Sequence, residues 1–142
     1  MSNLPEGLAQ YLDSVNVVEY SESAGGNAFI DDMPQVPESA GVTVGFFHTG
    51  GYEADTKHPY DTPVIQVLIR GTKDARDALT LWQSIYSQLH GLRNVTLPNG
   101  IYLVDAIVIQ SAPIRVGPDE NGRHRYSMNL RCEVLNPTQY RS

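Results

Sequence analysis

The stretch 63-PVIQVLIRGTKDARDALTLWQSIYSQLHGL-92 decides the fold, because it places a strand directly before the longest helix expected in the chain. Residues 63–70 alternate between two faces, with Ile65, Val67 and Ile69 on one and Gln66, Leu68 and Arg70 on the other. Residues 72–91 then repeat apolar side chains at helical spacing: Ala75, Ala78, Leu79, Trp82, Ile85, Tyr86 and Leu89. Thr72 is the expected N-terminal cap and Gly91 the expected end. This apolar stripe needs a sheet to cover.

Before this stretch, the sequence predicts a helix and two or three strands. Leu4, Leu8, Leu12 and Val15 recur at helical spacing, which predicts a short amphipathic helix near the N-terminus. Residues 42–48 form a well-patterned strand, a brief strand is expected near 28–31, and residues 16–20 are a further candidate strand.

After it, the pattern is that of consecutive strands. Asn99–Gly100 is the expected turn of a hairpin, and a long strand over 101–117 is interrupted near Ala112–Pro113. A turn over 117–125 leads to a final strand over 125–136. Two helices and five or six mostly antiparallel strands predict an α+β fold, with helices packed against one sheet.

Length and composition indicate one globular domain spanning residues 1–142. No apolar run approaches the roughly 20 residues of a membrane span, and the N-terminus lacks a signal-peptide pattern, so we expect no membrane partner and synthesis in the cytoplasm. The lone cysteine, Cys132, excludes an intramolecular disulfide and a multi-cysteine zinc site. Its alternation with the apolar residues of the last strand predicts a buried thiol.

Charge is distributed unevenly along the chain. Residues 1–63 hold ten acidic side chains and one basic one, Lys57, whereas residues 64–142 hold six acidic and nine basic side chains. The first half therefore predicts an acidic surface, which disfavours tight binding to nucleic acid and suits head-to-tail self-association. A solvated acidic face that keeps the protein soluble is an equally good interpretation.

The connection 48-HTGGYEADTKHPYDTP-63 holds most of the candidate site residues. Its histidines and carboxylates are residue types that bind metals, but they match no ligand spacing with a known mechanism. Its prolines and paired glycines favour an exposed interaction loop over about 49–62. A second long loop is expected over about 21–41, and the tail 136–142 is expected to be loose.

No catalytic motif emerges. Cys132 lies in mid-strand, no serine sits in a G-x-S-x-G elbow, and the glycine pairs do not follow phosphate-binding spacings. The sequence therefore predicts no enzyme, no metal and no cofactor. Arg123, Arg125 and Arg131 alternate along the last strand, which predicts an outward basic edge. Such an edge either prevents aggregation or docks on the acidic half of a neighbouring subunit.

A series of short motifs runs in order along residues 42–135: T-G-G at 49–51, Y-D-x-P at 60–63, Q-V-x-x-R-G at 66–71, L-H-G-L at 89–92, Q-S-x-P at 110–113 and D-E-N-G-R-H at 119–124. Together they resemble bacteriophage minor capsid proteins of the tail-terminator type, from long non-contractile tails. The resemblance implies a curved sheet with two helices packed on one face. It also implies a virion structural protein without catalytic residues.

The resemblance further implies a role and partners. Tail terminators form a ring, usually a homohexamer, that caps the tail tube, stops its polymerisation and offers the head–tail joining surface. The implied partners are further copies of the chain, the tail tube protein and the head–tail connector or stopper protein. DNA would pass through the lumen without specific binding. The expected location is the tail or neck of the virion, after assembly in the host cytoplasm.

A ring needs one face of each subunit to fit a different face of the next. The acidic first half and the basic last strand are the expected faces. Tyr52 and Tyr60 are the expected anchors of the interaction loop. Its other contact residues are Glu53, Asp55, Lys57, His58 and Asp61, whose carboxylates are also candidates to line the bore. The alternatives are a head-completion or connector protein on the portal side and a small metal-dependent enzyme.

Overall fold

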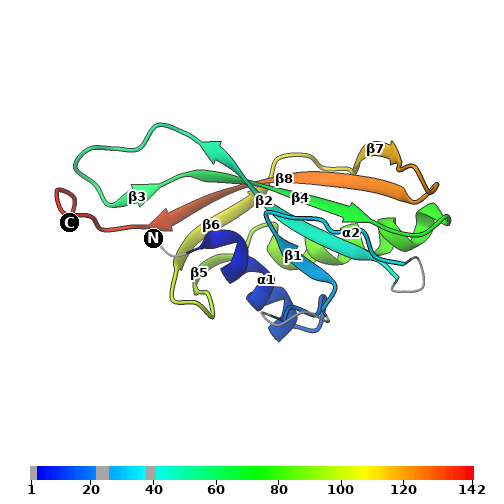
Figure 1. Ribbon diagram of the computed structural model, residues 1–142. Coiled ribbons are helices and arrows are strands. Elements are labelled where there is room, and N and C mark those ends of the chain that lie inside the picture. Colours follow the sequence, from blue (N-terminus) through cyan, green and yellow to red (C-terminus); the bar gives the residue numbers. More distant parts are fainter. Residues whose placement is uncertain (1–2, 22–25, 38–40) are drawn as a thin grey trace.

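The computed structural model describes residues 3–21, 26–37 and 41–142, so the expected loop over 21–41 lies partly outside the described residues. The described chain forms two helices and eight strands (Figure 1). Their order is α1 (Leu4–Ser14), β1 (Ala28–Ile30), β2 (Thr43–Gly51), β3 (Tyr60–Asp61), β4 (Pro63–Arg70), α2 (Ala75–Leu89), β5 (Arg93–Thr96), β6 (Tyr102–Val108), β7 (Ile114–Pro118) and β8 (His124–Leu135).

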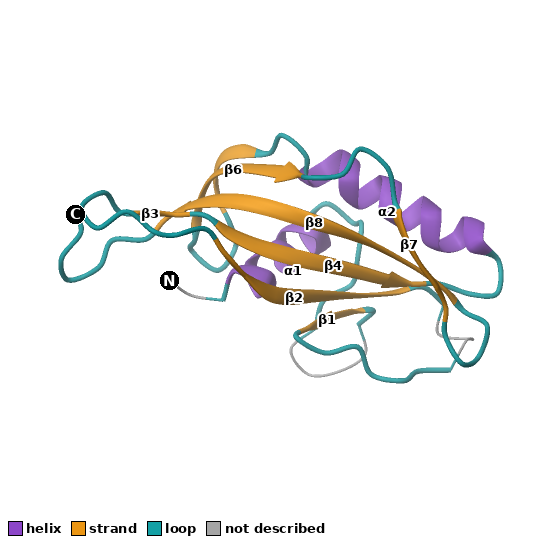
Figure 2. Cartoon of the chain, turned by 90° about the horizontal axis from the view of Figure 1, so that it is seen from above, coloured by secondary structure: helices purple, strands orange, loops and turns teal. Residues whose placement is uncertain are grey.

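One curved sheet holds all of these strands (Figure 2). Six of them form a continuous row in the order β1-β2-β4-β8-β6-β5, and the short strands β3 and β7 pair with the two ends of β8. The pairing of β1 with β2 is parallel, and the other pairings of the described strands are antiparallel. The predicted α+β class and mostly antiparallel sheet are thus confirmed, although the sheet is mixed.

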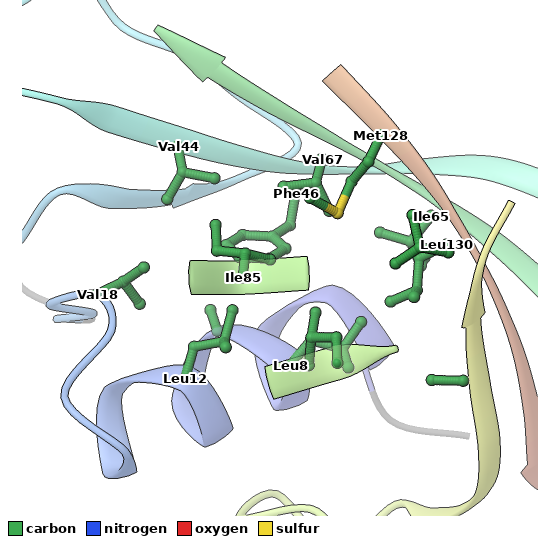
Figure 3. Packing of buried hydrophobic residues seen from close by; sticks show 14 of the residues in the cluster. Leu8, Leu12, Val18, Val44, Phe46, Ile65, Val67, Ile85, Met128 and Leu130 are labelled. Atoms are coloured by element: carbon green, nitrogen blue, oxygen red, sulfur yellow. The ribbon is translucent and has the colours of Figure 1, made fainter. Parts of the chain in front are cut away.

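Both helices lie on the same face of the sheet, below it in Figure 1. α1 contacts β1 and β2, while α2 contacts β4, β6 and β8. Figure 3 shows Leu8 and Leu12 of α1 and Ile85 of α2 meeting around Phe46 of β2. Neither helix is long and apolar enough to cross a membrane, within the part of the chain that the structure describes.

Packing holds α1 in place. An isolated helix of its length is marginal in water, but Leu4, Leu8 and Leu12 are almost completely buried. Burial of each such side chain contributes roughly 1.5–3 kcal/mol. The side chain of Asn3 accepts a hydrogen bond from the backbone N–H of Glu6 and so caps the first turn.

α2 follows the predicted stripe but not the predicted cap. Ala78, Trp82, Ile85 and Leu89 are buried in its core-facing side. Asp74, rather than Thr72, is the N-cap residue, and its side chain accepts a hydrogen bond from the backbone N–H of Arg76 at 3.0 Å.

Thr72 has a different role at the start of this helix. Its hydroxyl donates to Asp77 Oδ2 at 2.6 Å and so ties the approaching loop to the first turn. The end of the helix is as predicted, because Gly91 follows it with a φ of +82°.

The predicted strand over 16–20 is wrong. Asn16 takes a φ of +62° and turns the chain out of α1, and the backbone N–H of Val17 donates to Leu12 O at 2.9 Å. Glu19 O then accepts from the backbone N–H groups of Asn27 and Ala28. The apolar residues of this segment therefore pack against the core from a turn, so their β-propensity is overridden by tertiary contacts.

The predicted hairpin and interrupted strand are confirmed. β5 pairs with β6 across a turn in which the backbone N–H of Gly100 donates to Leu97 O at 2.8 Å. The break in the long strand separates β6 from β7, and β8 pairs with both. Cys132 lies in β8 with its side chain fully buried, as predicted. Burial raises the pKa of its thiol to about 12.

Candidate interaction surface

The sheet extends beyond the helices at one end, on the left of Figure 1. We call this extension, residues 49–63 together with residues 135–142, the arm. It consists of the end of β2, the connection to β3, the start of β4 and the C-terminal segment after β8. Figure 2 shows the same arrangement from above, with the arm projecting away from both helices. Most of the site residues predicted from the sequence lie on this arm.

Glycines shape the base of the arm. The pairing of β2 with β4 shifts between His48 and Gly51, where the chain bulges. Gly50 has a φ of +86°, a conformation that side chains other than glycine rarely adopt. A Cβ atom at Gly51 would lie 2.5 Å from Thr62 O, so the two strands approach this closely only without a side chain there. The T-G-G motif thus sets the path by which the arm leaves the sheet.

An ion pair ties the C-terminal segment to the arm. Arg141 Nη1 lies 2.7 Å from Asp61 Oδ1, and both side chains are largely enclosed. Arg141 also donates to Asn136 O at 2.9 Å and to Asp55 O at 3.2 Å. Asn136 Nδ2 donates to Asp61 Oδ2 at 2.7 Å, and the Asn136 backbone N–H donates to Pro59 O at the same distance. The expectation that residues 136–142 are loose is therefore wrong.

Two of the loop carboxylates form hydrogen bonds within the arm. Hydrogen bonding to Arg141 holds the pKa of Asp61 below its usual value, and Asn136 lowers it further. Asp55 Oδ2 accepts hydrogen bonds from the backbone N–H groups of His58 and Lys57, which lower its pKa as well. Two of the three predicted acidic residues thus stay ionised at neutral pH and hold the loop in shape.

The exposed aromatic side chains gather on this arm. Tyr52, Tyr60 and Tyr140 are 59%, 43% and 85% exposed. Tyr52 and Tyr60 were predicted as anchors, whereas Tyr140 was not, because the tail gave no sign of docking on a loop far away in sequence. Glu53, Lys57 and His58 are also exposed on the same loop. The arm therefore presents large aromatic side chains on a hydrogen-bonded frame, a combination typical of protein interfaces.

The histidines and carboxylates of the connection are separated by their own partners. His48 Nδ1 lies 2.6 Å from Asp31 Oδ2, and the His48 backbone N–H donates to Asp31 Oδ1 at 2.9 Å. Asp61 is held by Arg141. Among residues 3–21, 26–37 and 41–142, no three His, Cys, Asp or Glu side chains gather in a way that could hold a metal ion.

The prediction of an outward basic edge at Arg123, Arg125 and Arg131 is wrong. Strand β8 lies in the middle of the sheet, between β4 and β6, and the side chain of Arg123 is almost completely buried. Its Nε donates to Gly71 O at 2.8 Å, and its two terminal nitrogens donate to Val36 O and Gly41 O, each at 2.9 Å. Carbonyl groups satisfy this buried cation, which explains how it is tolerated inside the protein.

A second buried arginine, Arg70, which the sequence did not single out, binds the same loop region as Arg123. Arg70 Nη2 donates to Pro34 O at 2.6 Å, and Arg70 as a residue is almost as buried as Arg123. Burial lowers the pKa of Arg70, and the nearby Arg123 lowers it further. Together the two arginines fasten the described residues 34–37 and Gly41 to the sheet. The hydrogen bonds described for these two arginines are all within the subunit.

The other two arginines are half-buried. Arg125 Nε donates to Gly117 O at 3.1 Å and so braces β7. Arg131 lies on the sheet face away from the core, where it lines a hollow of about 320 Å³ with Tyr52, Thr62, Asp105, Ile107 and Glu133. Arg131 and the arm residue Tyr52 thus share one surface feature, which the sequence pattern did not reveal.

A comparison with protein families matches residues 11–136 to the family described as bacteriophage tail terminator protein. This range begins within α1 and includes α2, the whole sheet and most of the arm. The comparison with curated proteins found no match. The family is one of virion structural proteins, and its members act at the phage tail, in contact with other tail or head proteins. The chain belongs to the bacteriophage tail terminator family.

Proposed function

We propose that this chain forms a ring, a homohexamer, that caps the tail tube, stops its polymerisation and provides the surface to which the head is joined. The match of residues 11–136 to the tail terminator family carries this proposal. The subunit then interacts with further copies of itself, with the tail tube protein and with a head–tail connector or stopper protein. It assembles in the host cytoplasm and ends in the neck of the virion.

The shape of the subunit supports a ring. A closed ring needs one face of each subunit to fit a different face of the next. The arm projects from one end of the sheet, whereas the helices cover another part (Figure 1). One subunit therefore presents two unlike surfaces, of which the arm carries exposed tyrosines.

DNA passes through the lumen of the proposed ring without specific binding. Net charge favours this, since subunits of net charge −6 repel the phosphate groups of DNA. Of the three loop carboxylates proposed to line the bore, Asp55 and Asp61 hold the arm together. Glu53, which is exposed, is therefore the carboxylate to neutralise. Glu53→Gln should slow DNA ejection, and unchanged ejection kinetics would count against a place in the bore.

Polymerisation of purified tail tube protein tests the proposal in vitro. Tubes are grown with and without the chain, and their lengths are measured by negative-stain microscopy. A terminator shortens the tubes in proportion to the amount added, because each cap removes one growing end. Heat-unfolded chain is the matched control.

Unchanged tube lengths would contradict termination. Co-purification separates the alternative within the virion: a connector or head-completion protein would be retained by the portal and not by the tail tube protein.

A further inference from the structure

Beyond its first turn, which holds Arg76 and Asp77, the outer face of α2 carries no charged residue. Residues 78–92 contain no Asp, Glu, Lys or Arg, although such residues make up 18% of the chain. From residue 78 onward, the exposed positions of the helix are instead Thr80, Gln83 and Ser87. A helix with one buried stripe normally places charged side chains on its opposite face. Depletion of charge on an exposed helix face is a property of interface centres.

A groove follows this face and reaches Arg76 at the start of the helix. It has a volume of about 770 Å³ and is lined by α2 residues and by Val17, in the turn after α1. Val17 and Leu79 form its apolar part, and both also pack on the core. Hydroxyl and amide groups of Thr80, Gln83, Ser84, Ser87 and Gln88 line the rest, with Arg76 as the charged lining residue. The volume lies within the range of about 300–1,000 Å³ that holds a compact ligand.

The arm supplies side chains of the matching kind. Tyr52, Tyr60 and Tyr140 together expose roughly 300–450 Å² at about 150–250 Å² for each full side chain. That is about half of the ~800 Å² that each partner buries in a stable interface. A tyrosine has an apolar ring and a hydroxyl that needs a hydrogen-bond partner when buried. The apolar floor and the polar wall of the groove provide both.

We propose that the arm of one subunit packs into the α2 groove of the next subunit. This proposal rests on the ring proposed above and names the contact that closes it. Copies of a chain with net charge −6 repel each other, so they associate best through surfaces that carry little charge. The groove and the arm tyrosines are two such surfaces. The arm projects away from the helices in both views (Figures 1 and 2), so it faces a neighbour rather than its own groove.

Disulfide cross-linking between two separately purified variants tests this contact. One variant carries Tyr140→Cys on the arm and the other carries Ser87→Cys in the groove, both at exposed positions. The native Cys132 is buried and does not compete. Mixing the two under mild oxidation should give cross-linked dimers, whereas each variant alone should give almost none. The matched control replaces the groove variant by Ser14→Cys, an exposed position at the end of α1.

A second variant tests the energetics. Leu79→Asp places a charge in the apolar part of the groove and should weaken self-association by about 10-fold or more, equivalent to the loss of one good anchor. Circular dichroism checks that the variant is folded. Self-association that Leu79→Asp leaves unchanged would contradict the proposal.

The outcomes separate the contact from the ring. Rings seen by microscopy without cross-links between Tyr140→Cys and Ser87→Cys would overturn the arm–groove contact while leaving tail termination intact. Efficient cross-linking of Ser87→Cys with itself would also overturn it, because that result indicates a two-fold contact between grooves. Cross-links confined to the mixed sample support the proposal even where the purified chain fails to stop tube growth.

Discussion

Arg141 Nη1 and Asp61 Oδ1 are 2.7 Å apart, although the two residues are separated by 80 positions in the sequence. This ion pair fixes the C-terminal segment against the connection between β2 and β4. It brings Tyr140 to the same arm as Tyr52 and Tyr60. The arm is thus one hydrogen-bonded unit made from two distant parts of the chain.

Arg141→Ala should release the C-terminal segment without unfolding the core. The substitution removes the bonds to Asp61, to Asn136 O and to Asp55 O in one step. Limited proteolysis should cut within residues 136–142 about 10-fold faster, since local opening governs cleavage there. The urea midpoint of the whole domain should stay nearly unchanged. Lys57→Ala, an exposed position on the same loop, is the control and should not change the cleavage rate.

The attachment of the C-terminal segment to the arm should depend on pH only under acidic conditions. Asp61 has a pKa lowered from 3.8 by Arg141 and Asn136. A carboxyl whose pKa is lowered by folding stabilises the folded form above its unfolded pKa and loses this contribution as the pH falls through the folded one.

The ion pair should therefore hold from neutral pH to below pH 4, and it should be lost only as the pH falls through the lowered pKa of Asp61. NMR spectra of the Asn136 side-chain amide follow this directly. Asp61→Asn is the control, because it has no titration in this range. Release of the C-terminal segment between pH 5 and 7 would contradict the conclusion that the Asp61–Arg141 ion pair holds it.

Arg123→Ala should destabilise the whole domain. Three carbonyl groups, at Gly71, Val36 and Gly41, lose their donor in the interior. The loss of these hydrogen bonds should lower the free energy of unfolding by about 3 kcal/mol. At an m-value of about 2 kcal/mol/M, this lowers the urea midpoint by roughly 1–2 M. Arg115→Ala, at an exposed position of β7, should change stability by less than about 0.5 kcal/mol. Equal midpoints for the two variants would show that the buried arginine is dispensable.

Cys132 should resist alkylation until the protein unfolds. With a pKa of about 12, only about one thiol in 10⁴ is ionised at pH 8, and the side chain is fully buried besides. Iodoacetamide should label native protein over days and urea-unfolded protein within minutes, as mass spectrometry would show. Rapid labelling of native protein would mean that β8 opens locally.

The sequence predicted the elements whose pattern is local. The strand over 63–70 and the helix after it were predicted from the spacing of their apolar side chains. This spacing arises because one side of each element is buried in the core. The segment 16–20 was predicted as a strand because Val17 and Val18 favour one. In the structure, the positive φ of Asn16 and the bonds to Asn27 hold it as a turn.

Strand order and the arm could not be predicted in the same way. A strand with alternating arginines is compatible with an edge position and with a central one. Only the pairing of β8 with β4 and β6 shows that it is central. The burial of Arg123 depends on carbonyls contributed by distant loops. Tyr52 and Tyr60 were predicted as contact residues from the composition of their loop, whereas Tyr140 joins them on the arm only through the Arg141–Asp61 pair. Contacts of this kind leave no periodic signal in the sequence.

The tail-length distribution of a phage that lacks this chain tests its role most directly. Negative-stain microscopy of lysates would measure tail lengths, with the wild-type chain supplied in trans as the control. A terminator predicts overlong, irregular tails beside filled heads that carry no tail. Tails of normal, uniform length that fail to join heads would contradict termination and assign the chain to the head side of the junction.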